Sequence, residues 1–356
     1  MLFPNADVVV NPALLLLLGL MVGTLSGFFG VGAGLLITGG LLVFGVPPLF
    51  AVGTGLTLSM GASIINTLKH RKLGNVDFRL GFLTLAGTIP GLLVAERLNS
   101  KLEEAGAAGP VVAYLYVALL AAMSIFILYD YIKAGRGGVG RQDEVTTARL
   151  ARRLQSLRIP PHSIGLPWVG SLSTYVRLPA SGVETIPVTV PVSIGFGAGF
   201  LAGLLGAGGG FILLPAMIFV LGVPTAVAVG TGLFQAIITG SVGTLVYALS
   251  NHVDLLMVVI MLAASAIGSQ LGASATSTVA AARIRLLFAI TLLGSSVAIA
   301  LRQVSESASG AEFLSAAATA VLLGVAGAVC VVIAAMMVAA RRGRPALEGD
   351  EGRKAR

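Results

Sequence analysis

The chain has 356 residues, of which 56% are hydrophobic and only 11% are charged, and its mean hydropathy is +0.95. Soluble globular proteins carry roughly 25% charged residues, so this composition predicts a polytopic membrane protein and excludes a soluble enzyme, a nucleic-acid reader and a secreted disulfide scaffold. The net charge is +8, and the basic residues lie in loops between hydrophobic runs and in the C-terminal tail. This distribution is typical of positive-inside topology rather than nucleic-acid binding.

Nine hydrophobic runs are long enough to cross a bilayer, which requires about 20 apolar residues. The first run is preceded by no basic residue and carries no small-residue cleavage site, so we expect a retained helix and not a signal peptide. The fold class predicted is therefore all-α, with about nine membrane-spanning helices. The runs are Ala13–Phe29, Leu49–Leu68, Val76–Ala95, Val111–Ile132, Val188–Leu205, Ala226–Leu249, Leu255–Ala275, Ile284–Leu301 and Phe313–Ala340.

Two further apolar segments, Leu35–Val46 and Phe211–Val223, are too short for a full span. Each follows a glycine cluster and ends at a proline. Each is therefore predicted to be a re-entrant or broken helix.

The segment 133–187 is polar and basic, with eight Lys or Arg residues. Its middle, Val145–Ile159, places leucines at helical spacing between arginines. This pattern predicts either a basic amphipathic helix on an anionic membrane surface or a solvated linker helix. The tail Arg341–Arg356 is polar and predicted to be disordered.

The sequence contains an internal duplication. The 12 residues from Gly45 to Leu56 recur 177 residues later, from Gly222 to Leu233, with nine identities. Glycines upstream and a Val-Asp pair downstream match at nearly the same offset. A nearly constant offset over about 70 residues indicates a repeat rather than compositional bias.

Charge places the two copies in opposite orientations. The first copy has the basic loop 69–72, whereas its counterpart in the second copy, 251–254, has no Lys or Arg. Both copies obey the positive-inside rule only if the second is inverted, an arrangement common in secondary transporters. The predicted organisation is a first transmembrane repeat (1–132), a basic cytoplasmic linker (133–187), a second repeat (188–301), an additional membrane helix (302–340) and a cytoplasmic tail (341–356).

Candidate substrate-binding residues lie in the duplicated glycine clusters and just after them. Unwound, glycine-rich backbone can present N–H groups to an anion at a helix start, and the hydroxyls and amides nearby could add side-chain contacts. The alternative is that these glycines only allow tight helix packing. The candidates are Gly30, Gly32, Gly34, Gly53, Thr54, Gly55 and Asn66 in the first copy, and Gly206, Gly208, Gly210, Gly230, Thr231, Gly232 and Gln235 in the second.

The sequence indicates no catalytic, metal-binding or ATP-binding site. The three histidines lie in loops without metal-ligand spacing, and no acidic or basic residue lies deep in a run. No ATP-binding loop motif is present. We therefore expect no catalytic residues, no metal and no cofactor.

The duplicated loop, Gly206 to Pro215, together with Ala228 to Leu233 and their first-half copies, resembles the TauE/SafE family of membrane proteins. The resemblance implies a secondary transporter of small sulfur-containing anions, such as sulfite, a sulfonate or sulfoacetate, working as an exporter by alternating access. The expected partners are that anion and the lipid bilayer of a prokaryotic plasma membrane, with the C-terminus cytoplasmic. Self-association stays open. An anion channel, an importer and a non-transport structural membrane protein are the alternatives.

Overall fold

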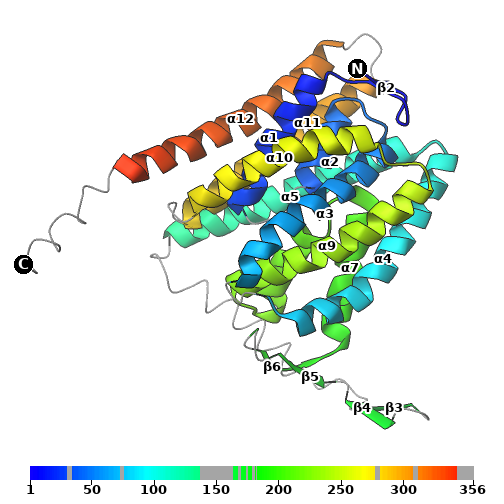
Figure 1. Cartoon of the computed structure of the whole chain (residues 1–356), viewed down its shortest axis with the longest axis vertical. Helices are drawn as coiled ribbons and strands as arrows, with labels where there is room; N and C mark the ends of the chain where they lie inside the picture. Colours follow the sequence, from blue (N-terminus) through cyan, green and yellow to red (C-terminus); the bar gives the residue numbers. More distant parts are fainter. Residues whose placement is uncertain are drawn as a thin grey trace, which may run out of the picture.

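The computed structural model describes residues 1–29, 34–72, 76–136, 163–166, 170–173, 175–178, 181, 183–276, 281–307 and 312–342. The amphipathic helix predicted at 145–159 and the tail beyond 342 lie outside this part of the chain. The fold is an all-α polytopic membrane protein (Figure 1). Its helices are α1 (Pro12–Phe29), α2 (Gly34–Val43), α3 (Pro48–Lys72), α4 (Phe78–Glu104), α5 (Ala108–Arg136), α7 (Thr189–Leu205), α8 (Gly210–Pro215), η2 (Ala216–Leu221), α9 (Thr225–Leu249), α10 (Leu255–Thr276), α11 (Ala281–Ser307) and α12 (Glu312–Arg342).

Within the described residues, eight helices are long and apolar enough to cross a membrane. The ninth predicted span forms α7, whose 17 residues cover about 26 Å, slightly less than a hydrocarbon core of about 30 Å. Large apolar side chains are exposed on the spans, for example Ile125 at 63%, Val259 at 63% and Val331 at 68%. In a membrane these side chains face lipid, so the exposed apolar surface needs no protein partner.

The two short segments form broken helices, as predicted. The first is α2, whose ten residues span about 15 Å. The second is divided into α8 and the π-helical turn η2, and Pro215 lies at the junction. Proline has no N–H to donate within the helix, and a wider π turn is one way the chain continues beyond it.

The helices pack in pairs that match the duplication. The repeat makes α7 the counterpart of α1 and α10 the counterpart of α4, and the two largest helix interfaces are α1 with α10 and α4 with α7. The remaining large contacts between the halves join α3 to its own counterpart α9, and α5 to α11. One two-fold relation between the halves accounts for all four interfaces.

The counterpart helices run antiparallel. Thr244 Oγ1 donates to Thr57 Oγ1 at 3.1 Å, and Ser241 Oγ donates to Met60 Sδ at 3.2 Å, so α9 descends as α3 rises. In the same way, α11 runs against α5, because Ser124 bonds the carbonyl of residue 289 and Ser296 bonds that of residue 117. These antiparallel pairs support the inverted repeat, whose orientation in the membrane stays a prediction.

Glycines form the closest helix crossings. On α1, Cβ atoms at Gly19 and Gly23 would lie 3.0 and 2.6 Å from the Cα atoms of residues 261 and 265 of α10. On α7, Cβ atoms at Gly195 and Gly199 would lie 3.0 and 2.6 Å from Cα atoms of residues 84 and 88 of α4. Real Cβ atoms do not approach so closely, so glycine is required for this packing, as in other small-residue membrane interfaces. For these glycines the packing interpretation holds.

A β-hairpin precedes the first helix of each half, at opposite ends of the bundle (Figure 1). Strands β1 (Leu2–Phe3) and β2 (Val8–Val9) precede α1, and β5 (Tyr175–Leu178) and β6 (Val183–Pro187) precede α7. Phe3 is buried in one hydrophobic cluster with residues of α2, and Leu178 in another with residues of α8 and η2. Each hairpin therefore contributes a buried apolar side chain to a cluster that includes the short helix of its own half. A third hairpin pairs β3 (Ser163–Leu166) with β4 (Gly170–Ser173).

Candidate functional site

The loop 206–209, which joins α7 to α8, is the centre of the candidate site. Gly206, Gly208 and Gly209 have φ values of 69°, 70° and 75°, a conformation that only glycine adopts readily. All four loop residues are buried. Non-helical backbone inside a membrane must be enclosed by protein or line a cavity, and this loop meets that condition.

Glycines of the first half enclose one side of the loop. A Cβ on Gly34 would lie 2.7 Å from the Gly206 carbonyl oxygen, and a Cβ on Gly55 would lie 3.1 Å from the same atom. The start of α2 and one turn of α3 therefore press backbone to backbone on the second-half loop. Three predicted site residues, Gly34, Gly55 and Gly206, are brought together here.

The C-terminal end of α7, which leads into the loop, is capped by side chains. The last carbonyls of a helix have no backbone partner within it. Here the carbonyls of residues 203, 204, 205 and 206 each accept a hydrogen bond from a buried side chain of another element. The donors, in that order, are Tyr247 (2.8 Å), Asn99 (3.2 Å), Tyr116 and Thr38 (3.4 Å).

On the other side of the loop lie polar side chains with unused hydrogen-bonding atoms. A Cβ on Gly208 would lie 2.7 Å from Ser59 Cβ, and a Cβ on Gly209 would lie 3.8 Å from Thr239 Cγ2 and 3.9 Å from Gln235 Oε1. All three polar side chains are fully buried. In the described part of the chain, Ser59 Oγ, Thr239 Oγ1 and Gln235 Oε1 have no hydrogen-bond partner.

Such unpaired atoms are costly inside a protein, by about 1–3 kcal/mol each. Gln235 is held in place by its other amide atom, Nε2, which donates to Thr88 Oγ1 of α4. Its Oε1 is thereby oriented without being satisfied. The three unpaired groups around Gly208 and Gly209 are suited to a small polar ligand that both accepts and donates hydrogen bonds.

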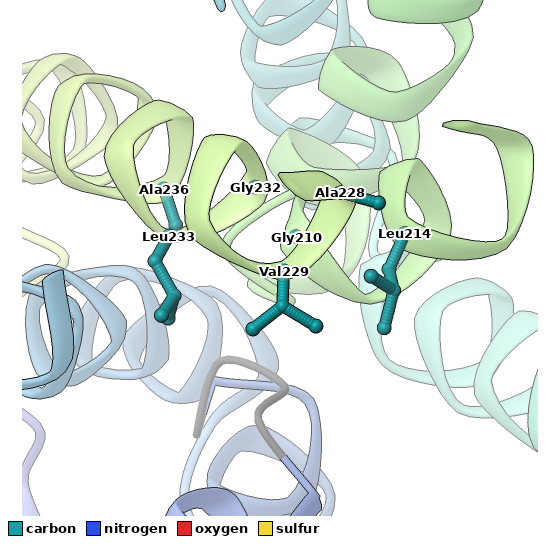
Figure 2. Close-up of a pocket in the computed structure, with 7 residues that line it drawn as sticks. All are labelled: Gly210, Leu214, Ala228, Val229, Gly232, Leu233 and Ala236. Atoms are coloured by element: carbon teal, nitrogen blue, oxygen red, sulfur yellow. The ribbon is translucent and has the colours of Figure 1, made fainter. Parts of the chain in front are cut away.

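Two further predicted glycines, Gly210 and Gly232, line a small hollow between α8 and α9 (Figure 2). The hollow has room for about one water molecule. Its other walls are the apolar side chains of Leu214, Val229 and Leu233, together with two alanines. Because these walls offer no polar side chain, the hollow is an extension of the site rather than its centre.

The two predicted threonines do not share a site. Thr231 Oγ1 accepts from the backbone N–H of Asp77 at 3.0 Å, at the start of α4. Thr54 follows Gly53, whose Cβ would lie 3.1 Å from Tyr247 Cβ near the end of α9. Residues 231 and 247 are separated by about 24 Å along α9. Thr54 and Thr231 therefore lie toward opposite ends of the α3–α9 pair.

The remaining predicted residues are spread out. Gly30 and Gly32 lie outside the described residues. Gly53 packs against the backbone between α9 and α10. Gly230 is buried on α9, and Asn66 is half-buried near the C-terminal end of α3.

Sequence reasoning selected no residue of the α7 cap and left Ser59 and Thr239 out of the site set. The only signal for the cap was an isolated polar or aromatic side chain inside an apolar run, as at Thr38 and Tyr247, whereas Asn99 lies in a polar stretch just beyond a run. Such residues are common in membrane helices. Only the three-dimensional structure shows that they converge on one helix end.

Comparison with known proteins adds the family. Residues 15–299 match the family model described as "Sulfite exporter TauE/SafE". The chain belongs to the TauE/SafE family. The matched range contains most of both predicted repeats and the glycine loop, and it ends before α12 begins. The chain is also 24% identical to the probable membrane transporter protein YunE of Bacillus subtilis (strain 168), over 290 residues that cover 79% of this chain and 94% of that protein. No solved structure matches the chain.

Proposed function

We propose that this TauE/SafE protein exports small sulfur-containing anions, such as sulfite, a sulfonate or sulfoacetate, as a secondary transporter. The family is one of membrane transporters and its description names sulfite export. The observation that carries the proposal is the set of buried, unpaired polar groups around the loop 206–209. They supply a compact group of buried hydrogen-bonding atoms that a small ligand would satisfy.

The chemistry of the loop suits a weakly held oxyanion. Ser59 and Thr239 offer hydroxyl donors, and Gln235 Oε1 offers an acceptor for a protonated oxygen or a bound water. The side chains that we find against the loop carry no formal charge. Transport requires binding that is strong enough for entry and weak enough for release. Neutral donors meet this requirement better than a buried arginine, which would hold the anion tightly.

A row of hydroxyls leads away from the loop. Ser59, Ser63 and Thr67 follow one another at four-residue spacing, on one face of α3, and their buried oxygens have no partner within the described residues. The row runs toward the C-terminal end of α3, which the basic loop predicts to be cytoplasmic. We propose that it forms the inner access route for the anion.

The two hairpins are suited to gating at opposite mouths. At the inner mouth, Ser181 Oγ, beside β5, donates to Asp77 Oδ2 at 2.6 Å. At the outer mouth, Asn5 of the first hairpin reaches the Val253 carbonyl at 3.5 Å, while Asp254 Oδ2 has no partner among the described residues. We propose that alternating access exchanges these two contacts, with one hairpin latched while the other is released.

The membrane potential supplies the direction. It is negative inside, so it drives an anion outward and opposes its entry. Export therefore needs no coupling ion, whereas import of the same anion would need one.

The test is counterflow of sulfite in proteoliposomes that contain the native protein. Native protein is expected to give saturable exchange, and the double variant Ser59→Ala with Thr239→Val is expected to lose most of it. The matched control is Ser265→Ala, because Ser265 is also a buried serine whose hydroxyl has no partner in the described structure, but it lies on α10 against α1.

Three outcomes would contradict the proposal. Equal loss of exchange in the variant and the control would remove the site from the loop. Flux that neither saturates nor shows counterflow would indicate a channel. Absence of flux, together with absence of thermal stabilisation by sulfite, sulfoacetate and taurine, would indicate a protein that does not transport these anions.

A further inference from the structure

An anion at the loop 206–209 faces an electrostatic difficulty. The loop begins at the C-terminal end of α7, where a helix carries a partial negative charge on its unpaired carbonyls. Left free, these carbonyl oxygens would compete with the anion for every donor nearby and repel it. A site for anions at this place needs something that occupies them.

The structure contains such a device. Four consecutive carbonyls at the end of α7, those of residues 203–206, each accept a hydrogen bond from a different side chain. We call these four donors the carbonyl collar: Thr38 of α2, Asn99 of α4, Tyr116 of α5 and Tyr247 of α9. All four side chains are fully buried. Asn99 also donates to the Tyr247 hydroxyl at 2.8 Å, so two members of the collar support each other.

The collar residues are not repeated at the equivalent positions of the sequence. Thr38 follows the glycines that match at an offset of 176 residues, so it corresponds to Leu214, which has no side-chain donor. By the 177-residue offset of the repeat, Tyr247 corresponds to His70 and Asn99 to Thr276. The identities of the collar residues are therefore not among the features that the two copies of the repeat share.

We propose that the carbonyl collar makes the loop 206–209 compatible with an anion, so that Thr38, Asn99, Tyr116 and Tyr247 are positioning residues for the transported substrate. This inference rests on the proposed function of the same loop. The collar occupies the four carbonyl oxygens, so that these do not compete for donors with the substrate, and Ser59, Gln235 and Thr239 stay available to it. None of the four collar residues needs to touch the anion itself.

The charge of the substrate provides the critical readout. Loss of a collar donor leaves a buried carbonyl unpaired and adds negative potential at the loop, which penalises an anion more than a zwitterion. Tyr116→Phe and Tyr247→Phe are therefore expected to raise the KM for sulfite about tenfold while changing the KM for zwitterionic taurine much less. Thr38→Val should have a smaller effect, because its hydrogen bond, at 3.4 Å, is the longest of the four.

The control is Ser124→Ala. Ser124 is also fully buried and also donates to a helix carbonyl, that of residue 289 at 2.8 Å, but between α5 and α11 and away from the loop. It should lower thermal stability by a similar amount and leave both KM values unchanged. Counterflow in proteoliposomes, normalised to folded protein and run with sulfite and with taurine, measures all of these variants.

The outcomes distinguish failure of the collar inference from failure of the proposed transport function. If native protein exchanges sulfite and the Tyr variants keep its KM, or change the KM for sulfite and taurine equally, the collar has only a structural role and the inference is refuted. If native protein exchanges neither compound, the proposed function fails, and the inference falls with it.

Discussion

The crossing of α7 with α4 gives a quantitative prediction. At Gly199 of α7, an added Cβ would lie 2.6 Å from the Cα of Thr88 on α4. Carbon atoms in contact are about 3.5–4.0 Å apart, so Gly199→Ala must move the two helices apart by about 1 Å. Overpacking of this kind costs about 1–3 kcal/mol, and the backbone atoms that the methyl group meets cannot change rotamer to avoid it.

The same helix provides the control. A Cβ at Gly197 would meet nothing within 4 Å. Both substitutions gain the same helix propensity, about 1 kcal/mol, so the difference between them isolates the cost of packing. Gly199→Ala is expected to unfold in detergent at a temperature about 2–10 °C below Gly197→Ala. Gly23→Ala, at the equivalent crossing of α1, should behave as Gly199→Ala does. Equal melting temperatures for Gly199→Ala and Gly197→Ala would refute the packing argument.

Two further predictions concern the loop and the inner mouth. Gly208→Ala should abolish sulfite exchange, because residue 208 has φ 70° and an added side chain would collide with Ser59. Gly232→Ala should retain exchange, because nothing lies within 4 Å of a Cβ at that position. The same counterflow assay measures both variants, and equal activities would contradict the assignment of the loop. Ser181→Ala removes the hydroxyl that binds the buried carboxylate of Asp77, so opening of the inner mouth should become easier and the maximal exchange rate should rise several-fold. An unchanged rate would mean that this contact is not a latch.

The helical part of the fold could be predicted from sequence because hydrophobic length in a membrane leaves few alternatives. Each of the nine predicted runs lies in a helix, and the two segments that are too short to span became α2 and the α8–η2 pair. The cluster of glycines, followed by a short apolar segment that ends at a proline, also predicted the position of the loop 206–209. The length of the hydrophobic runs, however, does not distinguish glycines that pack at helix crossings from glycines that form the loop. Gly199 and Gly208 look alike in sequence, but Gly199 is a helical residue at a helix crossing, whereas Gly208 has a φ of 70° in the loop.

The hairpins and the site geometry could not be predicted. The strands of the β5–β6 hairpin have only four and five residues, which is too short for an alternating pattern to stand out within the linker. Thr54 and Thr231 occupy equivalent positions of α3 and α9. Because these two helices run antiparallel, the two threonines lie toward opposite ends of the helix pair. A matched pair of residues in an inverted repeat therefore converges on one site only if it lies near the two-fold axis.

The two halves share their backbone scaffold but not the polar side chains of the candidate site, and this difference affects how many anions one chain can bind at a time. The features that the halves share act through the backbone: glycine crossings, a hairpin before the first helix, and aspartates that accept two N–H bonds at the starts of α4 and α10. The polar side chains around the loop are not shared. At the 177-residue offset, the counterparts of Ser59, Gln235 and Thr239 are Ala236, Leu58 and Ala62. Under the proposed function, polar groups that surround the loop 206–209 but have apolar counterparts at the repeat offset favour a single anion per transport cycle, bound off the symmetry axis on the second-half loop.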